Sequence, residues 1–264
     1  MIRLIAIMKI KLVTINTWKC DGDYYKRRQV LADQLQKLTP HIIACQECFL
    51  SEDEKIDTLR FLAEELDMYY HFTPARLKLR TLENEQVMSY SGLGILSAFR
   101  LGTINEFDLP TLAADGERRI QQVVMEISED KKLLLTNVHL THLKNAVDLR
   151  KEQLNLIAEK TADKNYNHHI ICGDFNATLD SKEINLFKAE TNAVDCYELG
   201  NGAEPRVSIN DGSGKCIDHI FSLPNPQLQS YTAFTNAAVV FNHPDDTGIF
   251  ASDHFGISTT LITV

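Results

Sequence analysis

Residues 170–176 of the chain read IICGDFN, an apolar run that ends in a glycine, an acid and an amide. The apolar run is typical of a buried strand, and glycine allows a sharp turn where such a strand ends. Residues 250–257 read FASDHFGI and place an acid and an imidazole, Asp253 and His254, beside another apolar run. Acidic, amide and imidazole groups at strand ends are of the kind that can converge on one phosphate group.

The rest of the chain alternates between strand-like and helix-like patterns, without a linker rich in Pro, Gly or Ser and without an internal repeat. This alternation indicates one α/β domain with mixed, largely antiparallel sheets packed between helices. We expect the domain to span 9–264 after a short N-terminal extension, 1–8. Strand patterns cover 9–15, 41–46, 92–97, 120–127, 133–139, 169–173, 216–222 and 253–262, and helical patterns cover 25–38, 53–66, 144–163 and 181–189.

Segment 74–91 differs from its surroundings because it is polar and charged and has no clear periodicity. A segment of this kind is predicted to be a loop, either a solvated connection or a mobile loop near the substrate. We therefore expect neither a helix nor a strand before residue 92 in this part of the chain.

The composition bears on partners and location. A formal charge of −9 and a pI near 5.5 argue against a protein that grips duplex nucleic acid through a broad basic surface, although a locally positive cleft is compatible with this charge. Six cysteines without framework or zinc-site spacing predict reduced thiols. The apolar N-terminus is too short for a signal peptide, and no run of about 18 apolar residues occurs. We expect a cytoplasmic monomer, with secretion by a route without a cleaved leader left open.

Polar groups suited to a divalent cation follow several predicted strands. Glu47 follows the strand at 41–46 and Asn16 follows the strand at 9–15. Because Mg²⁺ takes few carboxylates together with waters and a substrate oxygen, Glu47 can serve as a ligand and Asn16 can assist at the metal or the phosphate. Asp253 is given a metal-side role. Taken alone, Glu47 is more typical of a surface acid and Asn16 of a turn, so the prediction of a Mg²⁺ site, with Mn²⁺ as the alternative ion, rests on the repetition of polar residues at strand ends.

A second group of residues is predicted to carry the proton chemistry. Asp174 can orient an attacking water or take its proton, while Asn176 donates to the developing charge. His139 ends the strand at 133–139, where it is either a satisfied core imidazole or a donor to phosphate. Asp218 lies inside a strand, where a carboxylate is costly without a partner, and the imidazole of His254 is the natural partner. We therefore assign water activation to His254, held by Asp218.

Arg118 and Arg119 precede the strand at 120–127. Arginines at this position often face solvent, but a guanidinium can also bind a phosphate oxygen through two hydrogen bonds. Of the two, Arg119 is the predicted substrate-binding residue.

Taken together, seven motifs resemble the endonuclease/exonuclease/phosphatase superfamily, which includes pancreatic-type DNases, AP endonucleases, sphingomyelinases and inositol polyphosphate phosphatases. Their order agrees with that family from about residue 9 to the end. Two further likenesses leave the branch open, because NTW and HL resemble sphingomyelinase-like members and SDHFGI resembles tyrosyl-DNA phosphodiesterases. The motifs are TINTW at 14–18, CQE at 45–47, GLGILS at 92–97, NVHL at 137–140, GDFN at 173–176, IDHIF at 217–221 and SDH at 252–254.

The resemblance implies a four-layer α/β sandwich, in which two packed sheets are flanked by helices, and Mg²⁺-dependent cleavage of a phosphoester. It implies Glu47 as the principal metal ligand with Asn16 assisting. It also implies that Asp174 and Asn176 belong to the water and phosphate machinery. His139 would face the scissile phosphate, and Asp218 would orient His254.

Three functions follow as hypotheses. The first is a Mg²⁺-dependent phosphodiester hydrolase that uses in-line attack by water, with a nucleic-acid-derived or phospholipid head-group substrate. The second is a phosphomonoesterase on inositol phosphates or nucleotides, which a cationic cluster around the cleft would favour. The third is an inactive phosphate- or protein-binding module, against which the presence of Glu47, Asp174 and His254 argues. The basic residues available for a cationic cluster are Lys78, Arg80, Arg118, Arg119, Arg206 and Lys215.

Overall fold

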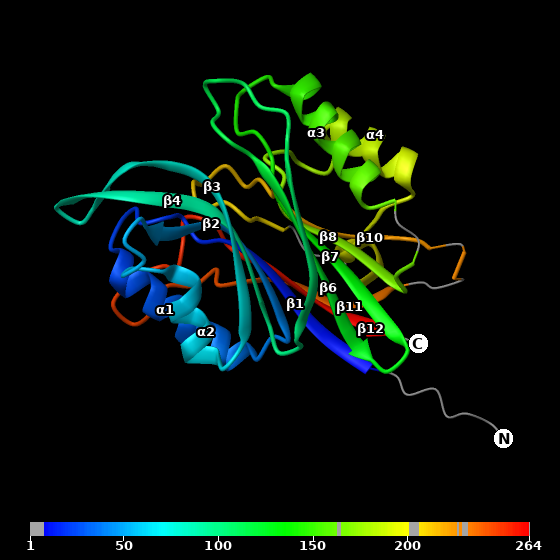
Figure 1. The fold of residues 1–264 in the computed structure, drawn as a ribbon, viewed down its shortest axis with the longest axis horizontal. Coiled ribbons are helices and arrows are strands. Elements are labelled where there is room, and N and C mark those ends of the chain that lie inside the picture. Colours follow the sequence, from blue (N-terminus) through cyan, green and yellow to red (C-terminus); the bar gives the residue numbers. More distant parts are fainter. Residues whose placement is uncertain (1–7, 163–164, 201–205, 226, 229–231, 264) are drawn as a thin grey trace.

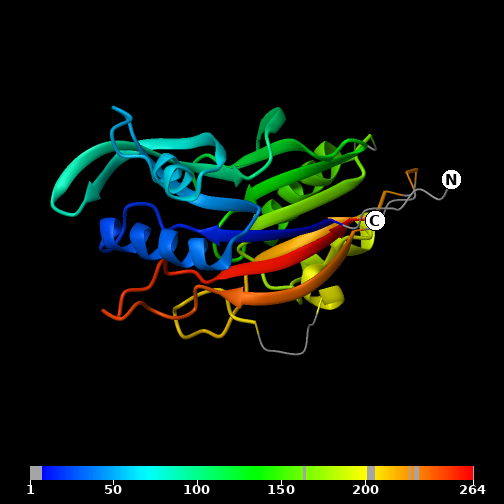
Figure 2. The same cartoon turned by 90° about the horizontal axis from the view of Figure 1, so that it is seen from below.

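In the computed structural model, two six-stranded sheets pack face to face with helices on their outer surfaces (Figure 1). The view from below separates the layers and shows the N-terminal and C-terminal strands side by side (Figure 2). This arrangement is the four-layer α/β sandwich expected from the sequence. The structure describes residues 8–162, 165–200, 206–225, 227–228 and 232–263, so most of the expected extension 1–8 lies outside the described residues.

The first sheet has the order β11-β12-β1-β2-β4-β3. Within it β1 and β2 are parallel, and the remaining neighbours are antiparallel. The parallel pair brings the carboxyl ends of both strands to the same edge. The strands are β1 (Met8–Asn16), β2 (Ile42–Ser51), β3 (Tyr69–Leu82), β4 (Glu85–Ser97), β11 (Ala233–Val240) and β12 (Gly256–Thr263).

The second sheet has the order β5-β6-β7-β8-β10-β9. Here β7 and β8 form the parallel pair, and β10 runs antiparallel to β8. The start of β10 therefore lies beside the end of β8. The strands are β5 (Leu101–Asp108), β6 (Arg119–Ser128), β7 (Lys131–His139), β8 (His168–Asp174), β9 (Val194–Asp195) and β10 (Asp218–Leu223).

The helices complete the layers. Two helices, α1 (Tyr24–Leu38) and α2 (Thr58–Leu66), pack on the outer face of the first sheet. Two others, α3 (Val147–Lys160) and α4 (Lys182–Thr191), cover the outer face of the second sheet. A short helix, α5 (Cys196–Gly200), packs against β11. The central core lies between the sheets and consists mainly of buried aliphatic side chains from both, with a few aromatic and sulfur-containing side chains.

Buried amides join the two sheets beneath the edge where the polar strand ends meet. Gln46 donates to the Thr14 hydroxyl and to the Asn137 side-chain oxygen, at 3.0 and 2.8 Å. Asn137 donates in turn to the backbone oxygens of Cys45 and Gly94. Because a buried amide is costly when it is unpaired, these bonds fix the register of the sheets relative to each other.

The expected strands and helices are all present, with some shifted ends. The helix expected at 53–66 begins only at Thr58, because the Asp57 carboxylate caps it by accepting from the backbone N–H groups of Leu59 and Arg60. The strand expected at 253–262 begins at Gly256, so Asp253 and His254 lie in the loop before it.

The prediction of a loop at 74–91 is wrong. These residues form most of the β3–β4 hairpin, which extends beyond the rest of the first sheet at the left of Figure 1. In its outer half Leu77 and Leu79 are exposed whereas Arg80 is buried, so burial does not follow the residue polarity on which a strand prediction relies. The backbone pairing continues nevertheless to Leu82 and Glu85.

All six cysteines are free and buried, as expected for reduced thiols. Within the described residues, no helix is both long and apolar enough to span a membrane.

Candidate active site

The predicted strand-end residues meet at one edge of the sandwich. Asn16 ends β1, His139 ends β7 and Asp174 ends β8. His139 and Asp174 are register partners across the parallel pair, and Asp218 is the register partner of Asp174 on β10. The parallel pairs thus bring together side chains that are far apart in the sequence.

Gly173 makes the last step of β8 feasible. Its φ is +142°, and a Cβ atom there would lie 2.0 Å from the backbone oxygen of Val138 on the neighbouring strand. No other residue type fits this space without moving a backbone atom. The glycine therefore sets the direction in which Asp174 leaves the sheet.

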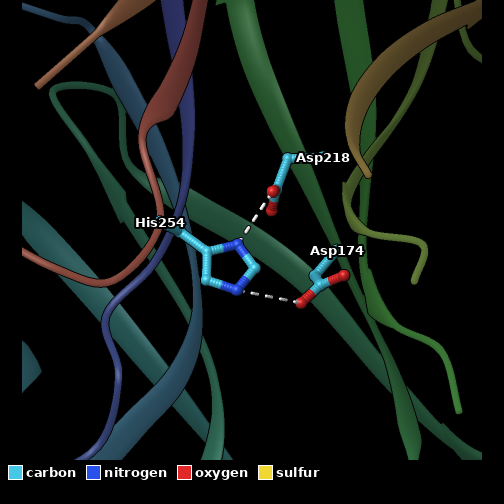
Figure 3. Close-up of side chains that lie close together, drawn as sticks. All are labelled: Asp174, Asp218 and His254. Carbon is cyan, nitrogen blue, oxygen red and sulfur yellow. Dashed lines mark hydrogen bonds and ion pairs between the residues drawn. The ribbon is translucent and has the colours of Figure 1, made fainter. Parts of the chain in front are cut away.

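A buried cluster of two acids and an imidazole lies at this edge (Figure 3). His254 Nδ1 is 2.9 Å from Asp218 Oδ2, the pairing expected from the sequence, and His254 Nε2 is 3.9 Å from Asp174 Oδ2. Burial opposes a charge on the ring. The carboxylates of Asp218 and Asp174 outweigh that effect and raise the pKa of His254 to about 10. In the metal-free protein the ring is therefore an imidazolium between two carboxylates.

Asp174 is the most highly connected member of the cluster. Its Oδ1 accepts the backbone N–H of Asn176 at 2.9 Å, and its Oδ2 accepts the side-chain amide of Asn16 at 3.1 Å. Burial, and then the charge of Asp218, raise the pKa of the Asp174 carboxyl to about 7. A carboxyl with such a pKa can exchange a proton near neutral pH.

Asn176 and His139 flank this carboxylate. The side chain of Asn176, which has a left-handed φ of +50°, donates to the backbone oxygen of Leu140 at 3.0 Å. His139 Nε2 lies 3.5 Å from Asp174 Oδ2. Burial, followed by the positive charge of Arg118, lowers the pKa of His139 well below its usual value. A neutral imidazole therefore faces the acid.

Glu47 reaches the site through an irregularity in β2. The register between β2 and β4 shifts between Cys45 and Cys48, and Glu47 adopts a φ of +53°. A bulge of this kind redirects a side chain away from the pleat. The Glu47 carboxylate is paired with Lys19, with 2.6 Å between Nζ and Oε2.

Several oxygen-bearing side chains of the site suit a hard cation. Burial raises the pKa of Asp253, and the charge of Glu47 raises it further, so the two acids are close enough to repel each other. Asp218 Oδ1 is buried and has no hydrogen-bond partner among the described residues. Carboxylate oxygens that repel each other or lack a hydrogen-bond donor are suitable ligands for Mg²⁺ or Mn²⁺. The amide oxygen of Asn16 instead accepts the backbone N–H of Trp18, at 3.0 Å.

A cavity of about 400 Å³ opens beside the cluster and is lined by His139, by the acids Glu47, Asp115 and Glu117, and by six basic side chains. Of the basic residues weighed from the sequence, Arg206 and Lys215 do not line it. Arg206 is instead buried in an ion pair with Asp195, at 2.7 Å. The six basic side chains are Lys19, Arg76, Lys78, Arg80, Arg118 and Arg119.

Arg119, the predicted phosphate ligand, lies in the wall of this cavity but is engaged elsewhere. Its guanidinium is 3.0 Å from a carboxylate oxygen of Asp108 and 3.4 Å from one of Glu106, and it donates to the backbone oxygen of Pro74. Arg118 is paired in the same way with Asp115, at 2.8 Å.

The sequence analysis did not predict two residues that lie near the site, Lys19 and Arg27. Lys19 pairs with Glu47, and the buried guanidinium of Arg27 donates to the backbone oxygens of Thr17, Asp21 and Ala251. Arg27 thereby ties the loop after Asn16 to the loop before Asp253. The run KRR at 26–28 shows only a basic stretch in a helix, and no local signal marks its second residue as buried.

Comparisons with known proteins agree with this geometry. The model of the Endonuclease/Exonuclease/phosphatase family matches residues 13–254, a range that contains every candidate site residue named above. A comparison with curated proteins gives no match.

Solved structures share the fold at low sequence identity. A family protein from Bacteroides thetaiotaomicron superposes with a TM-score of 0.78 at 18% identity, over 98% of this chain and 96% of that one. The mannosyl-6-phosphatase of the same organism gives a TM-score of 0.71 at 18% identity, over 96% and 99%. TDP2 of D. rerio, complexed with a single-strand DNA product, gives 0.73 at 20% identity, over 96% and 98%.

Proposed function

Because the chain belongs to the endonuclease/exonuclease/phosphatase family and is therefore a phosphoester hydrolase, we propose that it cleaves a phosphodiester with the help of Mg²⁺, for which Mn²⁺ can substitute. The observation that carries this proposal is the buried cluster of Asp174, Asp218 and His254 beside a cavity lined by Glu47. Buried acids paired with an imidazole can transfer protons, and the cavity has room for the ester.

Glu47 is the residue to which we assign the metal ion, with Asp253 beside it and Asn16 assisting through Asp174. When bound, the ion supplies positive charge to the phosphate oxygens and to the leaving oxygen. The residues of this chain do the rest. Lys19 is paired with the Glu47 carboxylate, and Arg27 ties the loop after Asn16 to the loop before Asp253.

The attacking water belongs between Asp174 and His254. The 3.9 Å between Asp174 Oδ2 and His254 Nε2 is too long for a direct hydrogen bond, and groups at such a separation can share a water. Asp174 and the His254 ring, which Asp218 holds in one orientation, orient this water and take its proton. His139 and Asn176 also lie beside Asp174, where they can donate to the phosphate oxygens.

The test is hydrolysis of bis-p-nitrophenyl phosphate by the purified protein. We expect turnover with Mg²⁺ or Mn²⁺, none with excess chelator, and a roughly 10²–10⁴-fold lower kcat in His254→Ala, the range for loss of an acid–base group. His243→Ala, which removes an exposed histidine remote from the cavity, is the matched control and should retain full activity. Near-native turnover in His254→Ala would exclude the mechanism, and no turnover of the bis ester by the wild type would exclude the phosphodiesterase and leave the monoesterase or a binding module.

A phosphomonoesterase is the second candidate, because a specific observation favours it. Four of the six basic residues weighed from the sequence line the cavity that contains Glu47. A cationic wall suits a dianionic monoester better than a monoanionic diester. Comparing kcat/KM for p-nitrophenyl phosphate with that for the bis ester decides between the two reactions.

The natural substrate can be sought among the chemical classes that the sequence and the neighbours suggest. A panel of single-stranded DNA, 5′-tyrosyl-DNA, RNA, sphingomyelin, inositol phosphates and mannose 6-phosphate covers them. The monomeric state and the cytoplasmic location remain predictions.

A further inference from the structure

The six basic residues of the cavity are not equivalent in their ion pairs. Lys19 is paired with Glu47, Arg118 with Asp115, and Arg119 with Asp108 and Glu106. The other three have no ion pair with any residue that the structure describes. These three are Arg76, Lys78 and Arg80.

The three unpaired cations share one strand and one face of it. They occupy alternate positions of β3, and side chains at alternate positions of a strand point to the same side. At about 3.3 Å per residue the row spans roughly 13 Å. The intervening Leu77 and Leu79 belong to the opposite face and are exposed. The cation face of β3 is therefore the face that borders the cavity.

Arg80 has no direct ion pair with any residue that the structure describes, although the charges of Glu47 and Asp21 act on it from farther away. Its side chain is only 7% exposed, and its Nε has no hydrogen-bond partner among the described residues. The remaining guanidinium nitrogens donate to Ser89 and to the backbone oxygen of Arg76, which are neutral. Burial lowers the pKa of Arg80, but a guanidinium stays charged in a protein. A buried charge with only neutral partners is costly, and an anion in the cavity would remove most of that cost.

Arg76 extends from β3 toward the loop before β6, which also lines the cavity. Its Nη1 lies 2.6 Å from the position that a Cβ atom on Gly116 would occupy, so the guanidinium rests against the loop before β6. Gly116 has a φ of +80°, which also favours glycine. The space beside the backbone at Gly116 thus admits the Arg76 side chain.

We propose that Arg76, Lys78 and Arg80 form a binding subsite for a second phosphate group of the substrate, next to the phosphate that is cleaved. The subsite rests on the proposed function, because it lies in the cavity that holds Glu47 and His139. The guanidinium groups of two arginines and the ammonium group of a lysine can donate hydrogen bonds to the oxygens of a phosphate. A row of three cations favours binding of a polyanion at this place, although the net charge of the chain is −9. The second phosphate is either the neighbouring phosphodiester of an oligonucleotide or a further monoester on a small molecule.

Binding without turnover tests the subsite separately from catalysis. The probe is tripolyphosphate, titrated calorimetrically into the protein in metal-free buffer. We expect Arg76→Ala/Lys78→Ala to bind it at least about tenfold more weakly than the wild type does. Arg80 stays intact, because its buried side chain also holds the hairpin. The control is Lys9→Ala/Lys132→Ala, which removes the same total charge near the first residues of β1 and β7, at the ends of these strands away from the site. This variant should bind tripolyphosphate like the wild type.

Turnover then identifies the source of the second phosphate. One pair of substrates is a dinucleotide with and without a 5′-terminal phosphate, and the other is an inositol bisphosphate and an inositol monophosphate. Within the pair that represents the true source, the extra phosphate should lower KM for the wild type. In Arg76→Ala/Lys78→Ala this advantage in KM should disappear, while kcat stays within about twofold.

The outcomes separate this inference from the proposed function. Equal affinity of the wild type and Arg76→Ala/Lys78→Ala for tripolyphosphate overturns the subsite, whatever the enzyme hydrolyses. An equal loss in the control variant also overturns it, because binding would then follow the total charge. If tripolyphosphate binds as expected but no ester is cleaved, the subsite stands and the proposed catalysis fails.

Discussion

The strongest single test of the cluster is Asp218→Asn, which removes one charge and little volume. The Asp218 carboxylate lies 2.9 Å from His254 Nδ1 and is the largest cause that raises the pKa of that ring to about 10, against an ordinary 6.5. The whole increase corresponds to about 5 kcal/mol of preference for the charged ring, shared among Asp218, Asp174 and Asp253. Since one opposite charge at this distance shifts a pKa by about 1–3 units, the variant should lower the His254 pKa by roughly that amount.

The sign of the stability effect follows from the same pKa. The folded-state pKa of His254 is raised above the unfolded value, so its stabilising contribution is complete below about pH 6.5 and is lost as the pH rises through about 10. In metal-free Asp218→Asn, the loss of unfolding free energy between these pH values should therefore be smaller than in the wild type.

The assays are an NMR titration of the imidazole resonances and urea unfolding at several pH values, both without metal. The side-chain amide that Asp218→Asn introduces can still accept a hydrogen bond from His254, so the fold should be retained, and an unchanged circular dichroism spectrum checks this. If the His254 pKa stays near 10 in the variant, Asp218 is not the group that holds the charge. The pairing argument is then refuted.

Two further predictions concern the backbone of the site. Gly173→Ala should lower the unfolding free energy by at least about 3 kcal/mol, because the new Cβ would lie 2.0 Å from the Val138 oxygen, and urea unfolding measures this. Arg27→Ala leaves the carbonyl oxygens of Thr17 and Ala251 without their donor and should cost about 3 kcal/mol, with a lower kcat against the bis ester. A stable but inactive Arg27→Ala protein would instead give Arg27 a direct part in the reaction.

Much of the site could be predicted because its residues lie where buried strands end. The apolar runs before Asn16, His139 and Asp174 identify β1, β7 and β8, and the carboxyl ends of parallel strands meet at one edge of a sheet. The pairing of Asp218 with His254 was predictable for a different reason. A carboxylate within an apolar strand requires a partner, and His254 offers an imidazole beside another apolar run.

The parts that could not be predicted depend on contacts distant in sequence. In the outer half of the β3–β4 hairpin the apolar Leu77 and Leu79 are exposed and the charged Arg80 is buried, so residue polarity does not indicate which face is covered. The bulge that turns Glu47 toward the cavity depends on the register of β2 against β4. The burial of Arg27 depends on carbonyl groups of two loops that meet only in the folded chain.

The same reasoning explains why an acidic protein can carry a cationic cavity. Lys19, Arg118 and Arg119 are neutralised by local acids and contribute mainly to the architecture of the walls. The unpaired cations are confined to one face of β3, a strand whose role the sequence conceals. Net charge describes the whole surface, whereas recognition depends on which charges lack partners. A hydrolase of this shape can therefore repel extended nucleic acid and still select a compact substrate with more than one phosphate.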